Sequence, residues 1–122
     1  MIEFTRANHI HICVPAERLE EAKQFYTGIM GLQLIERPDH LFSSAGYWLN
    51  IGDIQLHIGV EPYHGQSIRH TAFEVKDINE SRKHLEKSNV QILEEPRIPG
   101  RIRFAFIDPF GNRMELLQII DE

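Results

Sequence analysis

The sequence predicts an α+β fold built from two copies of one strand, helix, strand, strand, strand module. Two halves of about 60 residues present strand-like and helix-like segments in the same order. The strands alternate apolar and polar residues, whereas one segment in each half repeats its apolar residues at helical spacing. We therefore expect one domain, residues 1–122, with module one at about residues 5–61 and module two at about residues 67–120.

The first module opens with a strand at residues 8–14, which places His9, His11 and Cys13 on one face and apolar residues on the other. An amphipathic helix follows Pro15 and ends at Gly31. Further strands are predicted at residues 32–37, 47–51 and 54–60, and the last two are joined by a tight turn at Gly52 and Asp53.

The second module follows a linker at residues 61–66 and repeats this order. Its first strand covers residues 68–75. Asp77 is a predicted helix N-cap because Glu80 stands three residues later, and the helix continues to about Ser88. Three strands complete the module, at residues 90–93, 102–107 and 113–120.

Composition narrows the possible partners and compartments. The formal charge of −5 and the absence of a basic stripe argue against nucleic-acid binding. No segment approaches the ~20 apolar residues of a membrane span, and the N-terminus lacks a signal pattern. Cys13 is the only cysteine, so an internal disulfide is impossible. We expect a cytoplasmic protein without a membrane partner.

Glu115 is the least expected residue of the last predicted strand. The turn Asp108–Arg113 leads into an apolar run, and Glu115 lies inside that run. A buried carboxylate needs a cation or hydrogen bonds, because an unpaired charge costs several kcal/mol. A salt bridge to Arg103 or Arg101, which share a face of the neighbouring predicted strand, would serve, and so would a metal ion.

The repeat supplies further metal ligands at equivalent positions. His9 and His70 belong to the first strands of the two modules, and His57 and Glu115 to the last strands. Three imidazoles and a carboxylate suit Zn, Ni, Co, Mn or Fe(II) and leave positions open for a substrate. His11 shares the face of His9 and is the rival ligand. A lone histidine on a strand is more often structural than metal-binding, so the prediction rests on the four positions together.

Several motifs resemble the vicinal oxygen chelate superfamily, which includes glyoxalases, bleomycin-resistance proteins and extradiol dioxygenases. They are NHIHICVP, FYTGIMGL, QLHIGVE, RHTAFEVKDI and DPFGNRMELL, and they extend over nearly the whole chain. The resemblance implies two tandem βαβββ modules that form a curved, cup-like mixed sheet with helices on the outside. It also implies a homodimer, in which a partner chain completes the cup in some members.

The resemblance also assigns roles to individual residues. His9 matches the first-strand metal ligand of the family, in preference to His11, and His70 and Glu115 match the ligands of the second module. His57 stands where many members have glutamate, glutamine or histidine. The superfamily chemistry implies a small substrate that binds the metal through two adjacent oxygens.

Five residues are candidates to act on that substrate. Glu115 or His57 is the expected catalytic base, because proton transfer needs a group beside the metal. Arg103, and less directly Arg101, would bind an anionic group, and Trp48 would line an apolar part of the cup.

The expected function is a divalent-metal-dependent lyase, isomerase or epimerase, or thiol transferase. A metal-free protein that binds a small molecule or antibiotic, as bleomycin-resistance proteins do, is one alternative, although members of that kind usually lack this ligand set. An Fe(II) extradiol-type dioxygenase is another, and oxygen uptake with catechols would reveal it.

Overall fold

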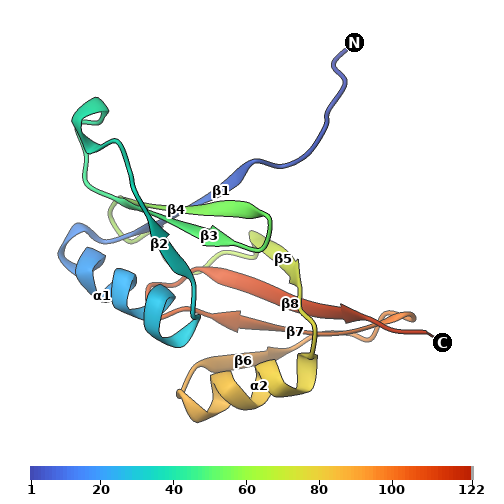
Figure 1. Ribbon diagram of the computed structural model, residues 1–122. Coiled ribbons are helices and arrows are strands. Elements are labelled where there is room, and N and C mark those ends of the chain that lie inside the picture. The colour runs from blue at the N-terminus through green and yellow to red at the C-terminus, as the bar shows by residue number, and fades with distance from the viewer. Residues whose placement is uncertain (122) are drawn as a thin grey trace. The chain divides into compact units, whose positions relative to one another are not determined.

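The computed structural model describes residues 1–121, which divide into two compact units, Met1–Tyr63 and a second that begins at His64 (Figure 1). Each unit contains a strand, a helix and three more strands, and each forms its own four-stranded mixed sheet. The predicted α+β fold of two βαβββ modules is therefore confirmed.

The sheet of the first unit has the order β1-β4-β3-β2. Its first and last strands are parallel neighbours, and the other pairs are antiparallel. The strands are β1 (His9–Val14), β2 (Gln33–Ile35), β3 (Tyr47–Ile51) and β4 (Ile54–Val60). The predicted second strand at residues 32–37 is thus shorter than expected at both ends.

The predicted first helix is confirmed, but its turns are not uniform. A 3₁₀ turn, Ala16–Arg18, leads into α1 (Leu19–Gln24), and a π-helical turn, Phe25–Ile29, follows. The widened turn is closed by the Met30 N–H, which donates to the carbonyl of Phe25 at 3.0 Å. Gly31 then adopts a φ of 73°, the left-handed conformation that ends many helices. A short 3₁₀ turn, Asp39–Leu41, was not expected from the sequence.

The second unit repeats the topology with the sheet order β5-β8-β7-β6. Its helix begins where predicted, because Asp77 Oδ1 accepts a hydrogen bond from the Glu80 N–H at 3.0 Å. The elements are β5 (His70–Glu74), α2 (Ile78–Lys87), β6 (Gln91–Glu94), β7 (Arg101–Ile107) and β8 (Arg113–Ile119).

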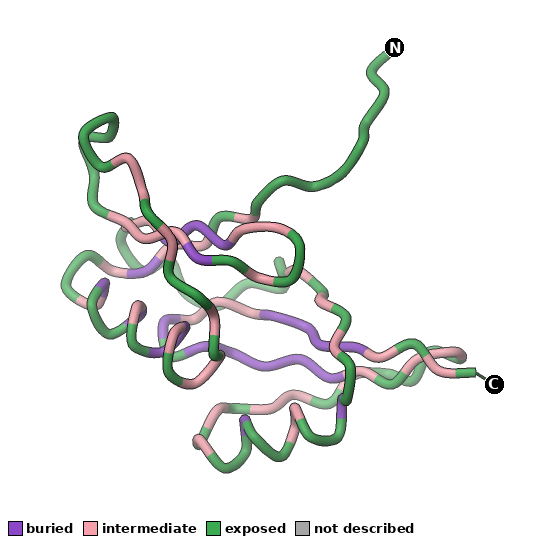
Figure 2. Tube along the Cα trace, viewed as in Figure 1, coloured by how far each residue is buried: buried purple, intermediate pink, exposed green. Residues whose placement is uncertain are grey.

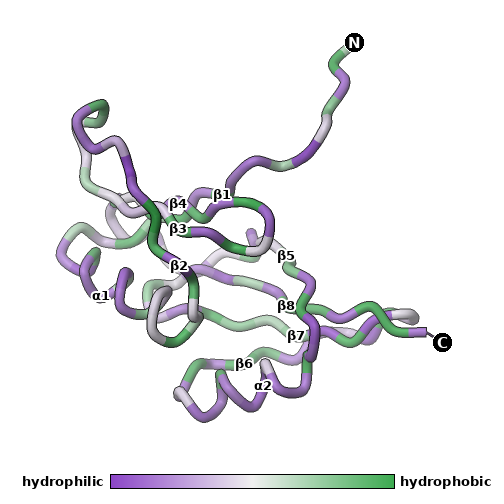
Figure 3. Tube along the Cα trace, in the orientation of Figure 1, coloured by the Kyte–Doolittle hydropathy of each residue, from purple (hydrophilic) through white to green (hydrophobic). Residues whose placement is uncertain are grey.

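Helix α2 covers one face of the second sheet. Its Arg82 guanidinium lies 4.7 Å from the ring centroid of Phe104, and its first N–H, from Ile78, donates to Gln118. Buried residues concentrate in β7 and β8, while α2 is mostly hydrophilic (Figures 2 and 3). The opposite face of β7 and β8 therefore carries the polar residues Arg103 and Glu115.

No helix within residues 1–121 is long and apolar enough to cross a membrane.

The turn between β7 and β8 is built around a buried aspartate. Asp108 is only 3% exposed, and its Oδ1 accepts hydrogen bonds from the backbone N–H groups of Phe110 and Asn112. Its Oδ2 accepts a third, from the Asn112 side chain at 2.9 Å. These bonds fix the length of the turn and hence the pairing of Ala105 with Glu115 across β7 and β8.

Candidate metal centre

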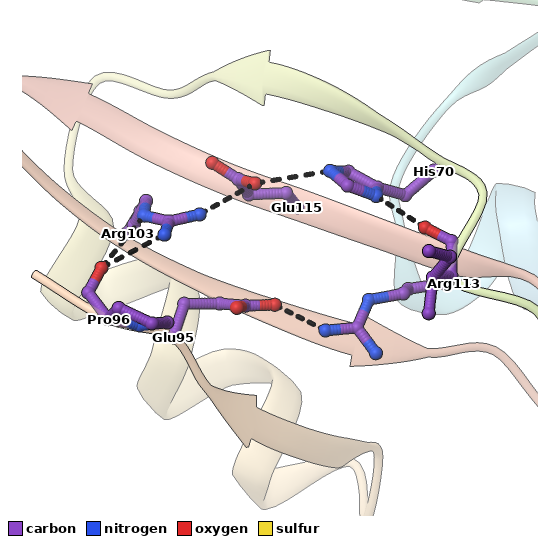
Figure 4. Close-up of polar contacts among 7 residues, drawn as sticks. His70, Glu95, Pro96, Arg103, Arg113 and Glu115 are labelled. Carbon is purple, nitrogen blue, oxygen red and sulfur yellow. Dashed lines mark hydrogen bonds and ion pairs between the residues drawn. The ribbon is translucent and has the colours of Figure 1, made fainter. Parts of the chain in front are cut away.

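Neighbouring parallel strands bring His70 and Glu115 together in the second unit. His70 belongs to β5 and Glu115 to β8, and the two side chains share a face of the sheet. The partners of Glu115 in register are both small, Ala72 and Ala105. His70 Nε2 therefore comes within 3.4 Å of Glu115 Oε1 (Figure 4). Glu115 is 5% exposed, which confirms that it is a buried carboxylate.

A backbone hydrogen bond determines which nitrogen of His70 faces Glu115. His70 Nδ1 lies 2.8 Å from the carbonyl oxygen of Ile68, and because a carbonyl only accepts, Nδ1 carries the proton. In the neutral ring Nε2 then presents a lone pair to the carboxylate oxygen. Two hydrogen-bond acceptors that face each other repel unless a cation or a proton lies between them. Both atoms can also ligate a metal, so this pair fits a divalent metal ion.

Arg103 is the protein partner of Glu115. Its Nη1 donates to Glu115 Oε1 at 3.1 Å, while Nε and Nη2 both donate to the carbonyl of Pro96, at 3.1 and 2.9 Å. Arg113 forms an ion pair with Glu95, which precedes Pro96 in the segment that follows β6. Arg101 differs from Arg103, since its buried Nε has no hydrogen-bond partner among the described residues. Of the two salt bridges considered from the sequence, the one to Arg103 is formed.

In the first unit, His57 is stacked between two rings. The centroid of His9 lies 4.1 Å away with an interplanar angle of 17°, and that of Trp48 lies 4.1 Å away with an angle of 3°. Burial, followed by electrostatic repulsion between a protonated His57 ring and His9, His11 and Arg37, lowers the pKa of His57 from 6.5 to about 4. His57 is therefore a neutral imidazole near pH 7.

Hydrogen bonds distinguish the two stacked histidines. His9 Nδ1 donates to the side-chain oxygen of Asn8 at 2.9 Å, so its Nε2 keeps a lone pair, as in His70. His57 has the reverse pattern, because its Nε2 donates to Gln55 Oε1 at 2.9 Å. A metal ion lies close to the plane of each ligating ring, and stacked, nearly parallel rings do not share such a point. The stacking therefore argues against His9 and His57 as joint ligands of one ion, and the lone pair on Nε2 favours His9.

His11 and Cys13 lie on the same face of β1 but make local contacts. The Cys13 Sγ is 3.7 Å from His11 Nδ1, and the His11 ring occupies the space that a side chain at Gly59 would need. Burial, with a smaller contribution from the Glu61 carboxylate, raises the pKa of the Cys13 thiol. A raised pKa disfavours the thiolate, so Cys13 is not an activated nucleophile.

The four predicted ligands thus fall into two pairs, one in each unit. Within residues 1–121, no three histidine, cysteine, aspartate or glutamate side chains are grouped as a ready metal site. Sequence reasoning missed four groups that orient the predicted residues: the carbonyls of Ile68 and Pro96 and the side chains of Gln55 and Asn8. Only Gln55 gave a signal in the sequence, since it shares the strand face of His57.

Comparison with known proteins places the chain in a family. The model of the Glyoxalase/Bleomycin resistance protein/Dioxygenase superfamily matches residues 7–116. A glyoxalase family protein from Bacillus anthracis shares 32% identity, covering 98% of this chain and 100% of that one, with a TM-score of 0.88. The chain belongs to the glyoxalase, bleomycin-resistance and dioxygenase superfamily.

Fosfomycin resistance proteins share the fold at lower identity. FosX from Listeria monocytogenes is 19% identical, with 97% of this chain and 96% of that chain covered and a TM-score of 0.79. A variant of the same FosX was crystallised with Mn(II) and 1S,2S-dihydroxypropylphosphonic acid. It is 21% identical over 97% of this chain and 95% of that chain, with a TM-score of 0.80.

Proposed function

We propose that this protein is a divalent-metal-dependent enzyme of the vicinal oxygen chelate type, acting on a small molecule through two adjacent oxygens. The observation that carries the proposal is the pair of His70 Nε2 and Glu115 Oε1, two acceptor atoms 3.4 Å apart on a buried strand face. The superfamily membership and the Mn(II)-bound FosX variant, which has the same fold, support it. A lyase, an isomerase or epimerase, and a thiol transferase are the reaction classes to test.

His70 and Glu115 would hold the metal, and His9 would supply a third ligand through Nε2. These three groups give one carboxylate and two imidazoles, a donor set that Zn, Ni, Co, Mn and Fe(II) all accept. His57 is the fourth predicted ligand, and to bind through Nε2 it would have to leave its stack with His9 and give up its hydrogen bond to Gln55. Mn(II) is the first ion to test, because the FosX variant contains it.

The metal would act as a Lewis acid that polarises the two substrate oxygens. Glu115 is the better candidate for the proton-transferring base, because His57 has a lowered pKa of about 4 and is a weak base near pH 7. Arg101 is the better candidate for binding an anionic group, because its buried Nε has no partner among the described residues and a buried donor without a partner is costly. Trp48 would contact an apolar part of the substrate.

One observation favours a second function, metal-free binding of a small molecule. Arg103 already pairs with Glu115 at 3.1 Å, so the buried carboxylate has a counter-ion without any metal. A binding protein of the bleomycin-resistance kind would need no more than this. The two functions differ in their response to metal ions and chelators.

Metal analysis of the untagged protein tests the proposal. We expect close to one equivalent of a divalent metal per chain, or binding of added Mn(II) by calorimetry with a rise in melting temperature. Glu115→Gln and His70→Gln should abolish this response, whereas His40→Gln, which changes an exposed histidine outside the pairs, should retain it. Unchanged melting of the wild-type protein with Mn(II), Zn(II), Ni(II), Co(II) and Fe(II) would favour the metal-free function.

We also propose a homodimer, as in family members of this size. Light scattering on the purified protein measures its mass directly, and a monomeric mass at micromolar concentration would refute this proposal. A screen of hemithioacetals, acyl-CoA epimers and fosfomycin would then distinguish the reaction classes.

A further inference from the structure

Arg103 connects Glu115 to the backbone of the segment that follows β6. Two of its nitrogens donate to the Pro96 carbonyl and a third donates to Glu115 Oε1 (Figure 4). The Arg103 side chain is only 15% exposed. We infer that Arg103 is a positioning residue, which holds the Glu115 carboxylate in the orientation that metal binding requires. This inference rests on the proposed function and adds a residue that acts through Glu115.

The contacts with Pro96 explain how one side chain can set this orientation. A guanidinium is planar, and hydrogen bonds from Nε and Nη2 to one carbonyl oxygen fix the direction of that plane. The fixed plane then directs Nη1 toward Glu115 Oε1. In register, Arg103 pairs with Leu117, so it reaches Glu115 diagonally across the two strands, a distance that a long side chain spans.

The neighbours of Glu115 make this restraint necessary. Ala72 and Ala105, its register partners on β5 and β7, have only methyl side chains and offer no hydrogen bond to a carboxylate. Besides Arg103, the described polar contact of Glu115 is with His70, which would be its fellow ligand. Without Arg103 the carboxylate could therefore rotate away from the position that faces His70 Nε2.

Positioning and simple charge compensation predict opposite changes in metal affinity. As a mere counter-ion, the guanidinium would repel a metal bound to Glu115, so its removal would tighten binding. As a positioning residue, Arg103 holds the metal ligand Glu115 in place. Loss of a hydrogen bond to a metal ligand usually weakens metal binding about 10- to 100-fold. The sign of the change therefore decides between the two roles.

The experiment compares Mn(II) binding by calorimetry in wild-type protein, Arg103→Met and Arg103→Lys, each confirmed as folded by circular dichroism. We expect Arg103→Met to bind Mn(II) about 10- to 100-fold more weakly. Arg103→Lys keeps the charge but lacks the planar fork, so it should lose a similar factor. It also provides the measurement if Arg103→Met does not fold.

Arg82→Met is the matched control. Arg82 pairs with Glu94 at 2.5 Å, at the end of β6, but makes no described contact with His70 or Glu115. We expect it to retain wild-type affinity even if its melting temperature falls. Equal or tighter binding by Arg103→Met, or full affinity in Arg103→Lys, would overturn the positioning role while the metal proposal stands. Absence of binding by the wild-type protein would overturn the proposed function itself.

Discussion

The indole of Trp48 lies parallel to the imidazole of His57, with centroids 4.1 Å apart and an interplanar angle of 3°. His9 stacks on the other side of His57, so three rings from three strands form one column. Trp48 is the only tryptophan of the chain. Its fluorescence therefore reports on the surroundings of His57 without any label.

Acidification should destabilise the protein through His57. Its pKa is lowered from 6.5 to about 4 in the folded state, so between these values the unfolded chain binds more protons. The stability contributed by neutral His57 is complete above pH 6.5 and is lost as the pH falls to about 4. At about 1.4 kcal/mol per pKa unit, the loss is at most roughly 3 kcal/mol.

Urea unfolding at a series of pH values, followed by Trp48 fluorescence, measures this loss. His57→Gln is the control, because it has no titrating group and should show a shallower dependence over the same range. If the unfolding free energy of the two proteins changes equally with pH, His57 is not the group responsible.

Gly46 and Gly28 should respond to alanine in opposite ways. A Cβ at Gly46 would lie 2.5 Å from the backbone oxygen of Ile58, which cannot move without disturbing β4. We expect Gly46→Ala to cost about 1–3 kcal/mol of unfolding free energy. Gly28 has no atom near its Cβ position and lies in a helical turn, so Gly28→Ala should add about 0.5–1 kcal/mol. Denaturant unfolding of both variants tests the contrast, and destabilisation by both would contradict it.

Asp108 should be far less replaceable than Asp77, although both accept backbone hydrogen bonds. Asn is nearly as good an N-cap as Asp, so Asp77→Asn should change the unfolding free energy by less than about 0.5 kcal/mol. Asp108 accepts from two backbone N–H groups and from the Asn112 side chain while buried. Asp108→Asn loses the charge and turns one acceptor into a donor, so we expect a cost of about 2–3 kcal/mol. Similar urea midpoints for the two variants would refute the distinction.

His9 and His57 should differ in their effect on metal binding. The Nε2 of His9 keeps its lone pair, whereas the Nε2 of His57 donates to Gln55. We expect His9→Gln to weaken Mn(II) binding by at least about tenfold and His57→Gln to change it much less. Calorimetry on both variants measures the difference. A larger loss in His57→Gln would restore His57 as the ligand.

The sequence was sufficient for features that depend on periodicity and local capping. The repeat predicted both βαβββ modules, strand alternation placed Glu115 on the polar face of β8, and Asp77 located the start of α2. The π-helical turn at Phe25–Ile29 could not be predicted, because the same apolar spacing suits an ordinary helix.

The choice between Arg101 and Arg103 could not be predicted either. Both lie on one face of β7, and the difference between them is the position of the Pro96 carbonyl, which belongs to a connection without a periodic pattern. The tautomers of His9 and His70 likewise depend on Asn8 and on the carbonyl of Ile68, contacts that follow from backbone geometry.

The Asp108 turn has a consequence for insertions and deletions in natural relatives. A gain or loss of one residue there would exchange the two faces of β8, so that Met114 or Leu116 would take the place of Glu115 beside His70. The connection at residues 61–66, which lies outside any sheet, has no such constraint. Relatives that keep a metal-binding glutamate should therefore vary in length at the connection and keep the number of residues between Asp108 and Glu115 unchanged.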